Sequence, residues 1–90
     1  MPLTLEQKKL YKLIDEILWN DWDPIGINDT EEARDEYQSY TPQIFSLRIN
    51  NSDIEIIAQH LYNIETDRMG LFGGLQKCRL VAEKIISASV

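Results

Sequence analysis

Carboxylates recur between Asp21 and Glu32 in an arrangement that resembles a calcium-binding loop. Acids occupy the first, third, ninth and twelfth positions of this twelve-residue stretch, and Gly26 occupies the sixth, as in a calcium loop. The fifth position is Ile25, where an oxygen ligand belongs, and Pro24 restricts a backbone that must curl around the ion. The chain has no second copy of the loop. We therefore expect no metal or other cofactor, with a metal-binding loop as an alternative hypothesis.

The residue types of catalysis are scarce in this chain. His60 is the only histidine and falls off the apolar stripe of its segment, which is typical of a surface side chain. Cys78 is the only cysteine and shares a helical face with apolar residues, so we expect it in the core. Asp21 and Asp23 could serve as general acid and base, but almost any acidic segment offers such a pair. We predict that the protein is not an enzyme.

The acids are concentrated in the first half of the chain. The net charge is −6, and nine of the fifteen acids lie between residues 15 and 36, where Arg34 is the only basic residue. That region has a formal charge of −8 and the remainder +2, so one end or face should be strongly negative. This charge repels phosphate backbones and anionic membranes, so we expect neither as a partner. The alternative is an acidic segment that only maintains solubility.

Aromatic residues accompany these acids. Four of the six tryptophan and tyrosine residues border or lie within the acidic region. Such side chains contribute much of the energy of protein interfaces, and surrounding carboxylates would attract a basic partner. The alternative is that the aromatics pack the segment against the rest of the fold. The predicted partner-binding residues are Asp21, Trp22, Asp23, Asp29, Glu32, Asp35, Glu36, Tyr37 and Tyr40.

Three strings of residues resemble a group of small acidic bacterial proteins. They are LWNDWDPIGIND over 18–29, ARDEYQSY over 33–40 and IETDRMGL over 64–71, and the similarity spans about residues 14–86. Most members of this group are uncharacterised helical proteins, and some act as immunity proteins against contact-dependent growth-inhibition toxins. The resemblance implies a protein that binds and neutralises a toxin with a basic surface, and it transfers no active site. Gln38 stands where many relatives have an acid.

Length and composition restrict the alternatives. A chain of 90 residues forms one domain with one core. A lone cysteine favours a reducing compartment, and no apolar run is long enough for a membrane span, so we expect a cytoplasmic protein. The second hypothesis is a small regulatory or structural helical module that acts as a homodimer through the Trp22 region.

The first helix is predicted from about residue 5 to about residue 20. Thr4 and Gln7 have the spacing of a capping box, and apolar residues then recur with helical periodicity. Between residues 20 and 41 the periodicity is lost, and proline, glycine and asparagine are typical of turns. A connection of this length is unusual in a compact domain unless it is functional or contains short structure of its own.

Three more helices follow. We expect a short one after Thr41, with Thr41 as N-cap and Pro42 at the first helical position. Ser52 and Glu55 suggest a second capping box for a helix that ends near Gly70, and the fourth helix should follow residue 74. The sequence thus predicts an all-α bundle of three long amphipathic helices plus one short helix, with a long acidic loop after the first helix.

Overall fold

The computed structural model describes residues 3–24, 26, 30–70 and 74–88, and within these ranges it is helical with no strand. This confirms the predicted all-α bundle. π-helical turns continue the first and third helices, and a 3₁₀ turn lies in the acidic segment. The α-helices are α1 (Leu5–Ile17), α2 (Thr41–Ile49), α3 (Ile54–Asn63) and α4 (Leu75–Ser87); the π turns are Leu18–Trp22 and Ile64–Arg68, and the 3₁₀ turn is Glu31–Ala33.

The start of α1 follows the prediction. The hydroxyl of Thr4 accepts a hydrogen bond from the Gln7 backbone N–H, and the Gln7 side chain accepts one from the Thr4 N–H, both at 3.0 Å. The two bonds satisfy backbone donors that the first helical turn leaves unpaired. The α-helix ends at Ile17, earlier than predicted, and the π turn then places Leu18, Trp19 and Trp22 in the core.

Two helix starts differ from the prediction by one residue. The N-cap of α3 is Asp53, whose carboxylate accepts from the Ile56 N–H at 3.0 Å, so the expected capping box starting at Ser52 was wrong. The reason is that the Ser52 N–H donates instead to the Leu47 carbonyl and closes α2. The N-cap of α2 is Tyr40. Thr41 is already helical and buried, and its hydroxyl donates to Asp15 Oδ1 on α1 at 3.4 Å.

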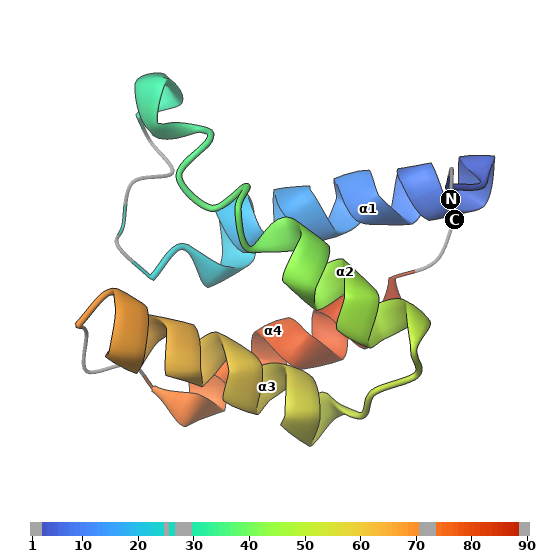
Figure 1. Ribbon diagram of the computed structural model, residues 1–90. Helices are drawn as coiled ribbons and strands as arrows, with labels where there is room; N and C mark the ends of the chain where they lie inside the picture. The colour runs from blue at the N-terminus through green and yellow to red at the C-terminus, as the bar shows by residue number, and fades with distance from the viewer. Residues whose placement is uncertain (1–2, 25, 27–29, 71–73, 89–90) are drawn as a thin grey trace.

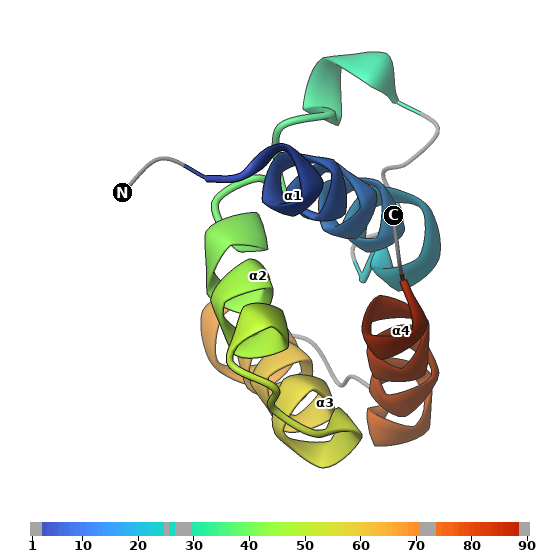
Figure 2. The ribbon, with the colours of Figure 1, turned by 90° about the vertical axis from the view of Figure 1, so that its right-hand side faces the viewer.

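The four helices enclose one core. Figures 1 and 2 show α1 lying across α2 and α4, while α3 and α4 pack side by side in opposite directions. The helices that the structure describes are all too short or too polar to cross a membrane. The fully buried hydrophobic side chains of this core are Ile14, Leu18, Trp22, Ile44, Ile57, Ala58, Leu61, Cys78, Ala82 and Ile85.

The acidic connection leaves the bundle on the far side of α1. In Figures 1 and 2 residues 30–36 stand above α1, away from α3 and α4. We call residues 30–36 the acidic arm. Consecutive tight turns give it structure, with the Ala33 N–H donating to the Thr30 carbonyl at 3.0 Å and the Glu36 N–H to the Ala33 carbonyl at 2.9 Å. The arm is therefore a folded projection of the domain.

Candidate functional site

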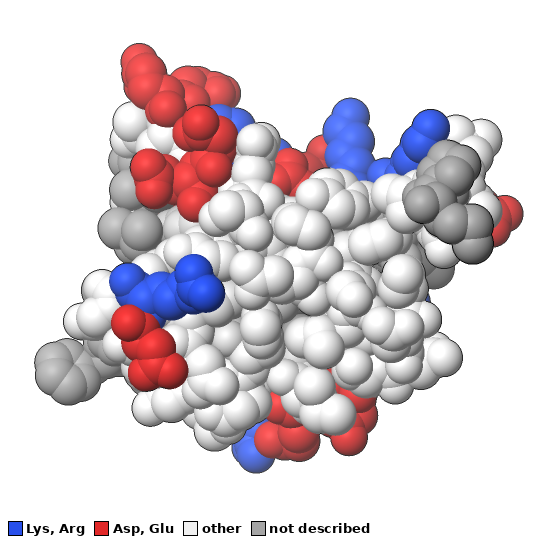
Figure 3. All heavy atoms as spheres, in the orientation of Figure 1, with Lys and Arg blue, Asp and Glu red and all other residues white. Residues whose placement is uncertain are grey.

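The outer surface of the acidic arm is a cluster of carboxylates. Glu31, Glu32, Asp35 and Glu36 are all exposed, and Figure 3 shows the acids gathered at the tip of the projection. Within the described ranges, none of the four lies at ion-pair distance from a lysine or arginine. Their charges therefore face solvent without a neutralising partner from the bundle.

Arg34, the one basic residue of the arm, turns inward. Its Nη2 lies 2.7 Å from Asp15 Oδ2 on α1, and its guanidinium lies 5.2 Å from the centre of the Trp19 ring. Both contacts are favourable, because a guanidinium pairs well with a carboxylate and stacks on an aromatic face. The inward turn ties the arm to α1 and pairs the arm's one positive charge with Asp15, although the Arg34 side chain is still one-third exposed.

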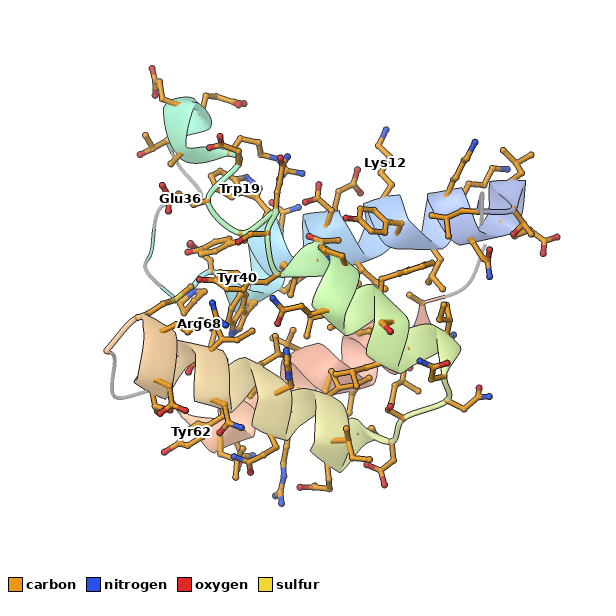
Figure 4. All side chains as sticks on the ribbon, viewed as in Figure 1. Lys12, Trp19, Glu36, Tyr40, Tyr62 and Arg68 are labelled. Atoms are coloured by element: carbon orange, nitrogen blue, oxygen red, sulfur yellow. The ribbon has the colours of Figure 1, made fainter. Side chains whose placement is uncertain are left out.

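The chain that follows the arm is anchored by aromatic packing. Tyr37 is 1% exposed, and its hydroxyl donates to Asp23 Oδ1 at 2.7 Å. Its ring centre lies 5.9 Å from that of Trp19 and 5.4 Å from that of Trp22. Tyr40 is half-buried and meets the Trp22 ring edge-on, in the region between the arm and α2 (Figure 4). These contacts fix where the arm leaves the bundle.

The predicted contact surface needs a correction at its aromatic residues. Trp22 is 0% exposed and Tyr37 is 1% exposed, so neither offers side-chain surface to a partner. They pack against each other and against their neighbours instead, because burying large rings stabilises a small core. The homodimer expected through the Trp22 region meets the same difficulty, since the indole is already enclosed within one chain.

Two of the predicted acids contact other side chains of the molecule. Asp21 Oδ1 lies 2.8 Å from the Lys84 ammonium on α4, and Asp23 accepts from Tyr37. Among the described residues no group of three or more histidine, cysteine or acidic side chains is placed to hold a metal ion. Asp29, with its neighbours 27 and 28, lies outside the described residues. The predicted acids that are exposed and make no ion pair among the described residues are therefore Glu32, Asp35 and Glu36.

The arm also includes an acid that the sequence analysis left out of the site. Glu31 is exposed and begins the 3₁₀ turn that also holds Glu32. Its position directly before a predicted site residue, in a segment expected to make a helical turn, was the available signal. The exposed cluster thus has four members, and the sequence predicted three of them as site residues.

A second polar cluster, which the sequence analysis missed, lies inside the bundle. The Glu65 side chain is 3% exposed, and its Oε1 accepts from the Trp22 indole N–H at 2.7 Å. The Cys78 thiol donates to the same oxygen at 3.5 Å, while Oε2 has no hydrogen-bond partner among the described residues. We call Trp22, Glu65 and Cys78 the junction. Glu65 follows Leu61 by four residues on the buried side of its helix, and this spacing was the signal available in the sequence.

The junction holds its thiol in an unreactive state. Burial raises the pKa of Cys78 from its ordinary 9.0 to about 12, and the negative charge of Glu65 adds to the effect. The thiol therefore stays protonated at neutral pH. Cys78 is fully buried, which confirms the prediction that it lies in the core.

His60 is half-buried, and its Nε2 lies 2.8 Å from Gln43 Oε1. Burial lowers the pKa of His60, and the positive charge of Arg68 lowers it further.

The junction and the arm lie near the same end of α1 (Figure 1). The junction connects this end to the other helices from inside the core, and the arm is attached to α1 from outside through Arg34 and Asp15. Comparison of the chain with protein-family models, with curated proteins and with solved structures finds no match.

Proposed function

We propose that this protein is a non-catalytic binding module whose acidic arm docks on a basic surface of a partner protein. The observation behind the proposal is that Arg34 pairs with Asp15 on α1, which leaves four exposed carboxylates on the arm that no cation among the described residues pairs with. In its most specific form the proposal is a cytoplasmic immunity protein that neutralises a toxin, as the resemblance described above implies.

The charge arrangement suits this role. A toxin that acts on nucleic acid needs a cationic surface to hold phosphate, and an anionic protein surface can cover it. The arm projects from the fold (Figure 1) and its four carboxylates are exposed, so they can approach such a surface without the bulk of the bundle interfering. Their field would also attract a basic partner over distance and raise the association rate.

The anchoring of the arm supports binding as well. Arg34 ties it to α1, and the buried Tyr37 fixes the chain that follows. A projection that is already ordered loses less conformational entropy on binding than a free segment. The proposal leaves catalysis out because the thiol of Cys78 is buried and protonated and His60 is hydrogen-bonded to an amide.

The test uses the product of the neighbouring gene as the partner and three forms of this protein. The arm variant changes Glu32→Gln, Asp35→Asn and Glu36→Gln. The control variant changes Glu6→Gln, Asp67→Asn and Glu83→Gln, three exposed acids of the same types outside the arm. Both variants have the same net charge, so any difference between them reports on position. Titration calorimetry over a series of salt concentrations measures the affinities.

We expect the arm variant to bind roughly 100-fold more weakly than the wild type, at about 1 kcal/mol per lost charge contact. The control variant should bind within about threefold of the wild type, because distant charges are screened. The wild-type affinity should fall as salt rises. Equal affinities for the arm and control variants, or an affinity that does not depend on salt, would contradict the proposal.

A further inference from the structure

The face of the molecule that bears the arm also bears a basic region. Lys8, Lys9 and Lys12 are exposed on the first three turns of α1. Lys9 and Lys12, with Leu13 and Glu16, line a shallow groove of about 380 Å³. Among the described residues none of these three lysines is engaged in an ion pair. The groove therefore offers the ammonium groups of Lys9 and Lys12 and the apolar side chain of Leu13 to an anionic segment, and the single carboxylate of Glu16 only partly offsets the two positive charges.

The lysines and the acids stand at opposite ends of the same helix and on the same side of it. Figure 3 shows basic side chains over the N-terminal half of α1 and the acidic cluster beyond its C-terminal end. In Figure 4 the labelled Lys12 points to the side of α1 on which the arm, with Glu36, projects. Acidic side chains also lie between the two groups, and Glu16 shares the groove with Lys9 and Lys12, so the face is positive over the N-terminal part of α1 and negative toward the arm.

We propose that a second copy of this chain docks on the lysine groove through its acidic arm. A two-fold axis perpendicular to α1, placed between the lysines and the arm, brings each arm over the other copy's lysines. The contact is self-complementary and closes as a dimer with two equivalent ionic contacts. It leaves the Trp22 side chain enclosed within each chain, and so differs from the homodimer expected from the sequence.

The net charge of −6 opposes such a dimer, and ionic strength decides which effect prevails. The domain measures 35 × 31 × 21 Å, so the centres of two copies would lie about 30 Å apart, roughly three Debye lengths at about 0.1 M salt. Over three Debye lengths the repulsion between net charges is screened about twentyfold, whereas pairs in contact keep most of their attraction. At about 1 M salt the Debye length falls to about 3 Å and the contact pairs are screened too.

This inference concerns the chain alone and does not rest on the proposed function. If the dimer and the binding of a partner protein both occur, the second copy and the partner compete for the arm. The arm is then covered in the dimer and available in the monomer. The two can fail separately, because self-association is measured without any partner present.

The test is a charge exchange between the two halves of the face. One variant carries Lys9→Glu and Lys12→Glu. The other carries Glu32→Lys, Asp35→Lys and Glu36→Lys, which turns the outer side of the arm from negative to positive even though Glu31 stays. In each variant alone, both contacts of the dimer bring like charges together. In a mixed pair both contacts regain opposite charges, one in the original sense and one reversed. Sedimentation equilibrium at about 0.1 M and about 1 M salt measures association, and circular dichroism checks that each variant is folded.

We expect the wild type to dimerise at about 0.1 M salt and to dissociate at least roughly tenfold more readily at about 1 M. Each variant alone should associate at least roughly tenfold more weakly than the wild type, and the mixture should recover to within about threefold. A control with Arg68→Glu and Lys77→Glu has the same net charge as the lysine variant and alters exposed residues elsewhere. It should dimerise like the wild type.

Three results would overturn the inference. The first is a wild type that stays monomeric up to about 1 mM, where even a weak complex is populated. The second is a mixture of the two charge-reversed variants that associates no better than either alone. The third is a control variant that loses the dimer as fully as the lysine variant does, since net charge rather than position would then explain the change.

Discussion

Glutamate has two opposite environments in this molecule. Glu65 is 3% exposed and meets an indole N–H and a thiol, whereas Glu32 and Glu36 on the arm are exposed and meet solvent. A buried carboxylate costs free energy unless donors compensate it, so its surroundings must be built around it. An exposed carboxylate makes no such demand. Stability should therefore depend on the junction, and the arm should be free to vary with its partner.

Arg34 and Tyr37 lie between these two environments. Arg34 belongs to the arm by sequence but contacts Asp15 and Trp19 of the bundle, and Tyr37 is buried against Trp22. The arm is thus exposed at its tip and buried at its base. Substitutions ordered from the junction outward should show effects that decline along this path.

Removing the junction's indole should have the largest effect. Trp22→Ala deletes a fully buried ring that packs on Tyr37 and Tyr40. We expect a loss of about 3–5 kcal/mol in the free energy of unfolding, measured by urea denaturation. Leu80→Ala, at a side chain 58% exposed on α4, is the control and should cost less than about 0.5 kcal/mol. Similar losses for the two variants would contradict the buried position of Trp22.

The junction's thiol should react very slowly in the native state. At pH 8 a pKa of about 12 instead of 9.0 leaves about a thousandfold less thiolate. The pKa of Cys78 is higher in the folded state than in the unfolded chain, so above pH 9.0 the thiol of the unfolded chain loses its proton while the folded thiol keeps it. The free energy of unfolding should therefore fall as the pH rises above 9.0. Labelling of Cys78 with a thiol reagent should follow global unfolding. Labelling of native protein as fast as of protein in urea would show that the thiol is accessible.

The hydrogen bond between Trp22 and Glu65 should appear as a coupling energy. Glu65→Leu leaves the indole N–H buried without an acceptor, and Trp22→Phe leaves Oε1 without its closest donor. Each change should cost about 1–3 kcal/mol beyond any packing loss. The double variant loses donor and acceptor together, so it should be more stable than the sum of the single losses predicts, by about 1–2 kcal/mol. Additive losses would mean that the bond contributes nothing to stability.

At the base of the arm the expected effect is smaller. Arg34→Met keeps the aliphatic stem and removes the contacts with Asp15 and the Trp19 ring, so we expect a loss of about 1 kcal/mol. Arg79→Met removes a more exposed ion pair with Glu55 and should cost less than about 0.5 kcal/mol. Thermal unfolding of both variants provides the comparison, and a larger loss for Arg79→Met would contradict the anchoring role of Arg34.

The sequence predicted the positions of the helices better than it predicted the polar contacts between them. Helical periodicity and the Thr4 capping box located α1, and the apolar face of the last segment placed Cys78 correctly. These features are local, so a single segment contains the information. The Asp53 cap was missed because Ser52 is used by the end of α2, which is a contact between two elements.

The candidate site was predictable only in its charge. The acids at 32, 35 and 36 are exposed as expected, but the direction in which Trp22 and Arg34 point depends on residues far away in the sequence. Trp22 is held by Glu65, which is 43 residues further along, and Arg34 by Asp15, 19 residues before it. No local pattern reports such partners, so sequence reasoning could not separate the aromatics that anchor from the acids that face outward.

The smallest effect is expected at the tip of the arm, and it is the most telling. Glu32→Gln, Asp35→Asn and Glu36→Gln together remove three charges that no described cation pairs with. The unfolding free energy should change by less than about 0.5 kcal/mol. Any change should be a gain, because the chain's net charge of −6 becomes smaller in magnitude and self-repulsion falls. Urea denaturation at low salt, where repulsion is strongest, is the sensitive measurement. A loss above about 1 kcal/mol would place these carboxylates among the groups that hold the fold together, and the contrast with Glu65 would disappear.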